Sequence, residues 1–285
     1  MDLRARLRGT PMHRAWRYAA SATGSVRLRN DLDGVRTYCL FIGHARSGHS
    51  IVGALLDAHP EMLISDELDA LEYLAAGFSR RQLLYLSLAV SRHQAQRQRR
   101  KTGRGGAVYS YFVPGQWQGT YLRLRVVGDS RAGWTTRRLS ENPALLTRLE
   151  RRMGGIQLRF IHVLRNPYDN IATLMIRDQR SFETAFARYF ENCEAITPLS
   201  SRIGTDRILR LRHEEVIHHP REALTRACAF LGVSPDAAYL EACGAILYGS
   251  PSRSREHVEW SDTEIERVRE RIDQFPFLSG YTFDE

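Results

Sequence analysis

The sequence predicts an α/β protein with a central parallel sheet of about five strands flanked by helices. Short apolar runs recur along the chain and are typical of buried strands. Segments with helical periodicity separate most of these runs. The first run leads directly into a glycine-bounded loop and then a helix, which is an arrangement that binds phosphate. The five predicted strands are Tyr38–Ile42, Met62–Ser65, Leu122–Val127, Leu158–Leu164 and Arg207–Leu211.

Composition limits the classes of protein that the chain can represent. At 285 residues it is long enough for one large domain with a sizeable core. Its net charge of +9 comes almost wholly from arginine, because Lys101 is the only lysine. Arginine supplies forked, permanently charged donors that suit phosphate and sulfate. No zinc spacing, basic repeat or RNA-binding signature accompanies this charge, so nucleic acid is not an expected partner.

We expect residues 1–36 to form an N-terminal leader and residues 37–285 a single domain with an insertion or lid around 79–119. The leader is basic and lacks the apolar core of a secretory signal, and no run is long enough to span a membrane. A packed or frayed leader on a cytoplasmic protein is the preferred interpretation; a transit peptide and a membrane-surface helix are the alternatives. The four cysteines lack metal-ligand spacing and should be reduced core residues.

The first motif is the segment GHARSGHS, residues 43–50. It has the spacing G-x-x-x-x-G-H-S, a nucleotide P-loop pattern in which histidine replaces lysine. Backbone N–H groups of such a loop and of the following helix point toward one anion. The motif therefore predicts a phosphorylated ligand, and the missing lysine argues against an ordinary NTPase.

The second motif, LRNPYDNIAT, follows the fourth predicted strand. Pro167 suits the first turn of a helix, and from that turn Arg165 and the hydroxyl of Thr173 could face one anion. They would lie at the carboxyl edge of the sheet, where such folds bind ligands. A P-loop kinase would instead carry an aspartate at the strand end to hold Mg²⁺. A helix-start salt bridge is the alternative role for Arg165.

Together the two motifs resemble the cofactor signatures of sulfotransferases that use 3′-phosphoadenosine 5′-phosphosulfate. In that family the first loop, P-[KR]-S-G-T-[TS], binds the 5′-phosphosulfate, and here His49 stands at its threonine position. The second signature, R-[ND]-P-x-D-x-x-x-S, binds the 3′-phosphate, and here Thr173 stands at its serine position. The resemblance implies cofactor contacts from Arg46, Ser47, Gly48, His49, Ser50, Arg165 and Thr173.

Two further segments extend the resemblance, which covers Phe41–Pro60 and Phe160–Tyr281. The stretch LRHEEVIHHP is similar to the family's YEDL segment, with His213 at the tyrosine position. The C-terminal stretch resembles the family's closing region. It implies basic contacts from Arg253 and Arg255 to the 3′-phosphate.

Sulfuryl transfer needs a base for the acceptor hydroxyl and a cation near the departing phosphate oxygen. The resemblance implies that Arg46 is the cation and that Glu67, just after the second strand, is the base. The alternative for Ser65-Asp66-Glu67 is that these residues simply begin a helix, where acids complement the helix dipole. His49 and Asp129 are the other candidates for the base.

Acceptor contacts are expected from Asp129 and Arg131 after the third strand and from Tyr111 and Trp117 in the insertion. The alternative for these aromatic residues is simple packing on the sheet. The implied function is sulfuryl transfer, without a metal, to a hydroxyl of a small-molecule or carbohydrate acceptor, as in bacterial specialised metabolism. A P-loop kinase or NTPase and a non-catalytic nucleotide-binding protein of the same fold are the alternatives.

Overall fold

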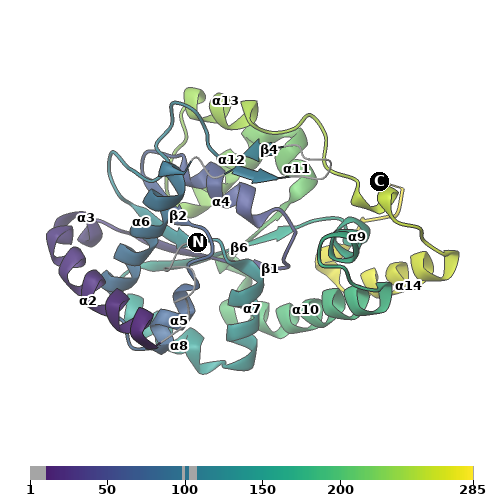
Figure 1. Ribbon diagram of the computed structural model, residues 1–285, viewed down its shortest axis with the longest axis horizontal. Helices are drawn as coiled ribbons and strands as arrows, with labels where there is room; N and C mark the ends of the chain where they lie inside the picture. Colours follow the sequence, from purple (N-terminus) through teal and green to yellow (C-terminus); the bar gives the residue numbers. More distant parts are fainter. Residues whose placement is uncertain (1–10, 98–99, 103–107, 285) are drawn as a thin grey trace.

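A computed structural model of the chain describes residues 11–97, 100–102 and 108–284. Its centre is a five-stranded, all-parallel sheet of order β2-β5-β1-β6-β7 (Figure 1). A separate two-stranded antiparallel pair joins β3 to β4. The strands are β1 Thr37–Gly43, β2 Met62–Ser65, β3 Arg100–Thr102, β4 Val108–Ser110, β5 Val126–Asp129, β6 Gln157–Leu164 and β7 Ile208–Arg212.

The predicted α/β fold with a parallel sheet is confirmed, and the five strands lie close to the predicted ranges. The largest difference is at β5, which was predicted over Leu122–Val127 but pairs only from Val126 to Asp129. The residues before it bond to the loop ahead of β2 instead, as in the 2.8 Å hydrogen bond from Leu122 N to Pro60 O. The apolar content of the sequence therefore predicted that β5 exists, while hydrogen bonding to the neighbouring strands determines the residue at which it begins.

Helices cover both faces of the sheet and its two sides (Figure 1). The longer ones are α2 Pro11–Arg27, α4 His49–Asp57, α6 Arg80–Gln96, α7 Ala132–Glu141, α8 Ala144–Met153, α9 Pro167–Arg177, α10 Phe182–Ile203, α12 Pro220–Leu231, α13 Ala237–Ala245 and α14 Asp262–Ile272. The shorter ones are α3 Arg29–Asp33, α5 Ala70–Ala75, α11 His213–His218 and the 3₁₀ turns η2 Thr205–Arg207, η3 Ser254–His257 and η4 Pro276–Leu278.

Alternate residues of the strands enter two separate cores, as expected for a parallel sheet buried on both faces. Leu40 and Ile42 of β1 pack with α6 and α8, whereas Cys39 and Phe41 pack with α4 and α12. A third cluster joins α9, α10 and α14 beside the sheet. All four cysteines are buried and free, as the sequence predicts.

The segments expected to be a leader and an insertion lie together on one side of the molecule. Residues 11–33 form α2 and α3, and α2 packs along α6, the first helix of the insertion (Figure 1). Parts of the insertion, residues 98–99 and 103–107, lie outside the described residues. Among the described residues, no helix combines the length and apolar character needed to cross a membrane.

Candidate active site

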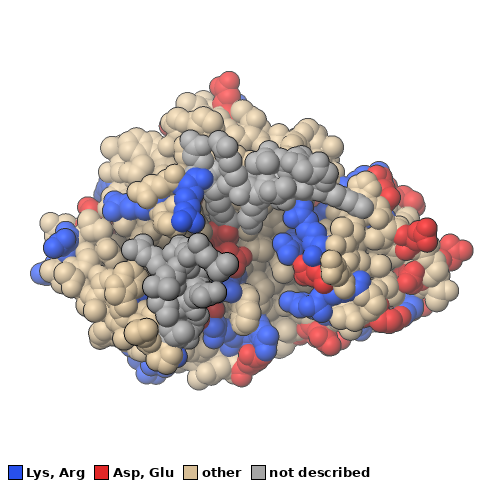
Figure 2. Space-filling model, viewed as in Figure 1, with Lys and Arg blue, Asp and Glu red and all other residues tan. Residues whose placement is uncertain are grey.

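A cavity of about 480 Å³ opens at the carboxyl ends of the parallel strands. The loop or helix that follows each of the five strands contributes at least one residue to it. Figure 2 shows basic side chains gathered around a hollow in this face of the molecule. Ten of the predicted site residues line the cavity: Arg46, Gly48, His49, Ser50, Glu67, Tyr111, Arg131, Arg165, Thr173 and His213.

The loop after β1 is shaped by residues in left-handed backbone conformations. Gly48, directly before α4, has φ of 90°, and a Cβ atom there would lie 2.3 Å from His213 Nδ1. Only glycine fits this position, because both the backbone angle and the neighbouring ring exclude a side chain. Ser47 does not line the cavity; it is buried, and its hydroxyl donates to His44 O at 2.9 Å. The structure thus gives Ser47 a bracing role within the loop.

Arg46 also has a left-handed backbone, with φ of 65°. Its Nη2 lies 2.9 Å from Oδ1 of Asp178, the residue that ends α9, and both residues line the cavity. A left-handed conformation in a residue other than glycine costs energy and is concentrated at functional sites. The ion pair therefore fixes a strained cation at the cavity wall.

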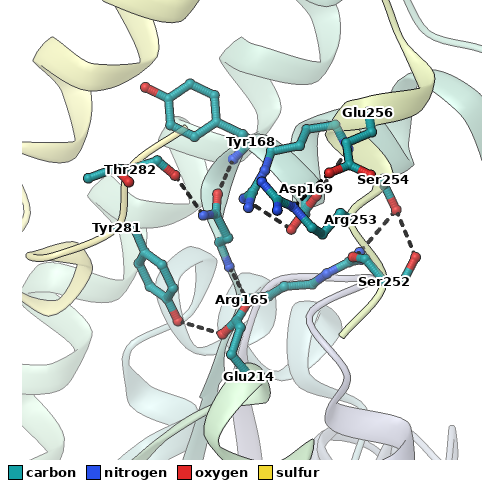
Figure 3. A network of polar contacts seen from close by, with 12 residues as sticks. Arg165, Tyr168, Asp169, Glu214, Ser252, Arg253, Ser254, Glu256, Tyr281 and Thr282 are labelled. Atoms are coloured by element: carbon teal, nitrogen blue, oxygen red, sulfur yellow. Dashed lines mark hydrogen bonds and ion pairs between the residues drawn. The ribbon is translucent and has the colours of Figure 1, made fainter. Parts of the chain in front are cut away.

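Arg165 is buried at the end of β6 and is held from several sides (Figure 3). Its Nη1 donates to Thr173 Oγ1 at 3.0 Å, and its Nη2 donates to Ser254 Oγ at 3.0 Å and to Ser252 O at 2.8 Å. The Thr173 hydroxyl also lies 3.0 Å from Ser254 Oγ. Burial lowers the pKa of Arg165, yet guanidinium remains charged in proteins. A preorganised cation and three hydroxyl-bearing residues thus meet at one end of the cavity.

The structure places Arg253 and Arg255, which were expected to contact the 3′-phosphate, away from the cavity, and neither residue lines it. Arg255 is buried against Asp169, with its backbone N 3.0 Å from Oδ1 and its Nη1 3.3 Å from Oδ2. Arg253 points outward to Glu256 and to the carbonyl of Asp284. In this alternating segment, Ser252 and Ser254 face the cavity instead.

The C-terminal segment supports the Arg165 site from behind (Figure 3). Asn166 donates from Nδ2 to Thr282 O at 2.8 Å and from its backbone N to Glu214 Oε1 at 2.8 Å. Tyr281 donates to the other oxygen of Glu214 at 3.0 Å. The start of α9 is therefore tied both to the helix after β7 and to the final residues that the structure describes.

The loop after β2 carries Glu67, which has φ of 63°. The interpretation of Asp66 and Glu67 as the start of a helix is wrong, because α5 begins at Ala70 with Asp69 as its N-cap. The Glu67 side chain is 49% exposed, and its Oε2 lies 3.1 Å from Arg131 Nε. Glu67 thus stands in the cavity wall as a carboxylate held by one cation.

Asp129 was expected to contact the acceptor, but it does not line the cavity. It is buried, and its carboxylate accepts hydrogen bonds from Leu68 N at 3.1 Å and from Ala70 N at 3.0 Å. Burial raises its pKa to about 6, while those two N–H donors act in the opposite direction. Asp129 therefore holds the backbone of the loop that carries Glu67.

A second carboxylate, Asp66, is buried beside the loop after β1. Its Oδ1 accepts hydrogen bonds from Ser50 Oγ at 3.1 Å and from Ser130 Oγ at 2.7 Å. His49, Asp66 and Glu67 each offer one possible metal-ligand atom, and these atoms lie within 4.8 Å of one another. A strand-end aspartate that could hold Mg²⁺ was not expected from the sequence. The structure has one, because Asp66 directly follows β2 and contacts the loop serine Ser50.

The acceptor side of the cavity is only partly as expected. Tyr111 and Arg131 line it, whereas Trp117 does not; its backbone N bonds to Ala58 O at 3.1 Å. The sequence analysis missed Trp134, which is 44% exposed in the cavity, with the Arg131 guanidinium 5.0 Å from its ring centre. Further missed lining residues are Arg177, Asp178, Arg188, Ile217, Ile246, Leu247, Tyr248, Ser252 and Ser254.

A family model described as "Sulfotransferase family" matches residues 40–237, and the chain belongs to that family. The chain is also similar to several solved structures. The sulfotransferase domain of the Synechococcus PCC 7002 olefin synthase is 18% identical over 83% of this chain and 88% of that chain, with a TM-score of 0.46. The sulfotransferase domain from the curacin biosynthetic pathway is 14% identical over 84% and 98%, with a TM-score of 0.48.

Mouse sulfotransferase SULT7A1, solved in complex with PAP, is 10% identical over 89% of this chain and 90% of that chain, with a TM-score of 0.47. No curated protein matches the chain. Family membership and the α/β fold thus define the chain as a sulfotransferase.

Proposed function

We propose that this sulfotransferase moves a sulfuryl group from 3′-phosphoadenosine 5′-phosphosulfate to a hydroxyl of a small-molecule or carbohydrate acceptor. The observation that carries the proposal is that the loop after β1, the Arg165 cluster and Glu67 line one cavity. The loop after β1 and the Arg165 cluster suit a donor that carries a phosphate at each end. The Glu67 carboxylate suits an acceptor that must lose a proton.

The Arg165 cluster fits the 3′-phosphate. Arg165 Nε is buried without a hydrogen-bond partner among the described residues, so the guanidinium keeps an unused donor. The Thr173 and Ser254 hydroxyls lie beside it and can rotate to donate to an anion. Arg177 lies one helical turn after Thr173 on α9 and also lines the cavity, which adds positive charge at this end.

The loop after β1 fits the 5′-phosphosulfate. Its backbone curves at Gly48 and continues into the N-terminus of α4, where the first N–H groups of a helix lack partners within the helix and can bind an anion. Beyond them, His213, Ile217, Ile246, Leu247 and Tyr248 form an aromatic and aliphatic part of the lining. We assign the adenine base to this part, because a flat apolar ring gains most from such contacts.

In the transfer step the acceptor oxygen bonds to sulfur while the bond between sulfur and the 5′-phosphate oxygen breaks. The acceptor proton passes to the Glu67 carboxylate, and the electron pair of the broken bond stays on the phosphate, whose charge Arg46 offsets. The products are a sulfate ester and adenosine 3′,5′-bisphosphate. Arg131 contacts Glu67 and orients its carboxylate until the acceptor arrives.

One observation favours a second candidate, a Mg²⁺-dependent NTPase or kinase. A loop serine beside a strand-end aspartate is how P-loop enzymes hold Mg²⁺, and Ser50 lies 3.1 Å from Asp66. The missing loop lysine and membership of the sulfotransferase family argue against this candidate.

Thermal unfolding with each nucleotide separates the two. We expect adenosine 3′,5′-bisphosphate to raise the melting temperature in the presence of a chelator, and ATP with Mg²⁺ to leave it unchanged. Transfer of labelled sulfate from the donor to a panel of phenols, alcohols and sugars then tests catalysis. Stabilisation by MgATP alone would overturn the proposal. Binding of the bisphosphate without transfer to any acceptor would favour a non-catalytic binding protein.

A further inference from the structure

Helix α2 carries an apolar stripe that faces away from the protein. Seven large apolar side chains are exposed among the described residues, and four of them lie on this one helix. Two of the other three, Trp134 and Tyr248, line the active-site cavity. The third, Leu122, lies in the segment before β5. Exposed apolar surface outside the cavity is therefore concentrated on α2.

The stripe follows helical spacing. Met12 and Trp16 are separated by four residues and are 67% and 59% exposed, and Val26 at the far end is 72% exposed. Ala19 and Thr23, which occupy the positions between them, are exposed as well. The Trp16 ring stacks only on His13 of its own helix among the described ring contacts.

The opposite side of α2 docks on the protein through small and polar residues and through the Tyr18 ring, which lies edge-on to Phe78 with centroids 5.1 Å apart. Ser21 and Ser25 are the buried residues of the helix. Gln82 of α6 donates from Nε2 to Tyr18 O at 3.1 Å and to Ser21 Oγ at 3.3 Å. A Cβ atom on Gly24 would lie 2.1 Å from the Tyr85 ring, so this glycine permits close approach. An amphipathic helix normally turns its apolar side inward, and α2 does the reverse.

The charge of this part of the sequence indicates what covers the stripe. The first 30 residues contain seven arginines and one acid, Asp2. Arg27, at the end of α2, is exposed beside Val26. Tryptophan and aliphatic side chains along one side, with arginines around them, are typical of helices that lie in the interface of an anionic membrane. A second copy of the chain would carry the same positive charge and would be repelled.

We propose that the outward side of α2 binds an anionic phospholipid surface, with Met12, Trp16 and Val26 in the interface. The helix lies at the edge of the molecule against α6, and its outward side is exposed among the residues that the structure describes (Figure 1). The proposal is independent of the chemistry in the cavity.

The test is co-sedimentation of the full chain with vesicles of phosphatidylcholine alone or containing about one third phosphatidylglycerol. We expect binding only to the anionic vesicles, weakened by added salt because surface charges are screened. The double variant Met12→Ser/Trp16→Ser should bind at least about tenfold more weakly, because two apolar side chains no longer enter the interface. Leu122→Ser is the matched control, since Leu122 is as exposed as Val26, and it should bind like the wild type.

A second variant, Arg27→Gln, tests the charge without touching the stripe and should weaken binding about fivefold. Thermal unfolding checks that each variant is folded. Equal binding to both vesicle types, or full binding by the double variant, would overturn the proposal. No binding at low salt would also overturn it. Light scattering of the protein alone tests whether the stripe is instead a contact between two copies of the chain. Dimers that the double variant abolishes would assign the stripe to a second copy instead.

Discussion

The two walls of the cavity are built in opposite ways. The anion wall, made of Arg165, Thr173, Ser252 and Ser254, is cross-linked by hydrogen bonds near 3 Å, and its Arg165 and Thr173 side chains are buried. The loop wall, made of Arg46, Glu67, Arg131 and Asp178, consists of partly exposed ion pairs, and two of its residues have left-handed backbones. One wall is held in place by hydrogen bonds among its own residues. The other holds charged groups in strained positions from which they can be drawn to new partners.

The substitution with the largest expected effect is in the loop wall. Glu67→Gln keeps the size of the side chain but removes its capacity to take a proton. We expect turnover to fall on the order of 10²–10⁴-fold, with the affinity for adenosine 3′,5′-bisphosphate near that of the wild type. Glu72→Gln is the matched control, because Glu72 pairs with Arg138 and does not line the cavity. Near-normal turnover in Glu67→Gln would exclude it as the base and make His49 the next candidate.

Two buried histidines near the loop wall, His44 and His162, should make the stability of the protein sensitive to acid. Burial lowers the pKa of His44 to about 4, and it also lowers the pKa of His162, which lies against Gly43. Below about pH 6.5 the unfolded chain therefore takes up protons that the folded protein does not. The free energy of unfolding consequently decreases as the pH is lowered. For His44 alone the loss by pH 4 is on the order of 3 kcal/mol.

We expect the free energy of unfolding of His162→Leu to decline less steeply between pH 6.5 and 4 than that of the wild type, as measured by urea titration. The raised pKa of Asp129 acts in the opposite direction, but it is common to both proteins and cancels in the comparison. Parallel pH profiles would show that His162 does not contribute to acid sensitivity.

At the anion wall, Arg165→Ala should lower the affinity for adenosine 3′,5′-bisphosphate about 10- to 100-fold, since a charge-assisted hydrogen bond contributes about 1.5–3 kcal/mol. Adenosine 5′-phosphate, which lacks the 3′-phosphate, serves as the control ligand and should lose far less affinity. Calorimetric titration of both ligands measures the difference. The same loss for both would remove Arg165 from the 3′-phosphate site.

The smallest effect should come from releasing Arg46. Asp178→Asn removes the carboxylate that holds its guanidinium at 2.9 Å and lowers the negative charge of an anion-binding cavity. We expect donor affinity to rise about two- to fivefold, as partly exposed ion pairs contribute up to about 1 kcal/mol. Weaker donor binding in this variant would mean instead that Asp178 positions Arg46 for the ligand.

Much of the cavity lining was predictable because it is encoded locally. The segments GHARSGHS and LRNPYDNIAT each contain a strand end, a turn and a helix start, so spacing alone places their side chains. Gly48 and Arg165 needed no knowledge of the rest of the chain to be placed at one sheet edge.

What could not be predicted depends on distant partners. Arg255 is directed inward by Asp169, 86 residues away in sequence, and this leaves Ser254 to face Arg165. Asp129 stands at a strand end as predicted, yet backbone N–H groups of residues 68 and 70 turn it away from the cavity. Trp134 carries no local signal, because its exposure depends on how α7 packs against β1 and α10.

The ties between Asn166 and Thr282 and between Glu214 and Tyr281 have a consequence for synthesis on the ribosome. The segment that braces the Arg165 site is made after every strand of the sheet. A nascent chain can form the sheet and the loop after β1 before these residues leave the exit tunnel, but its anion wall then lacks both the brace and the Ser252 and Ser254 contacts. Binding of the proposed donor should therefore require the residues from Ser252 to Thr282 in addition to the sheet, and a variant that lacks Tyr281 and Thr282 should keep a folded sheet but bind the donor more weakly.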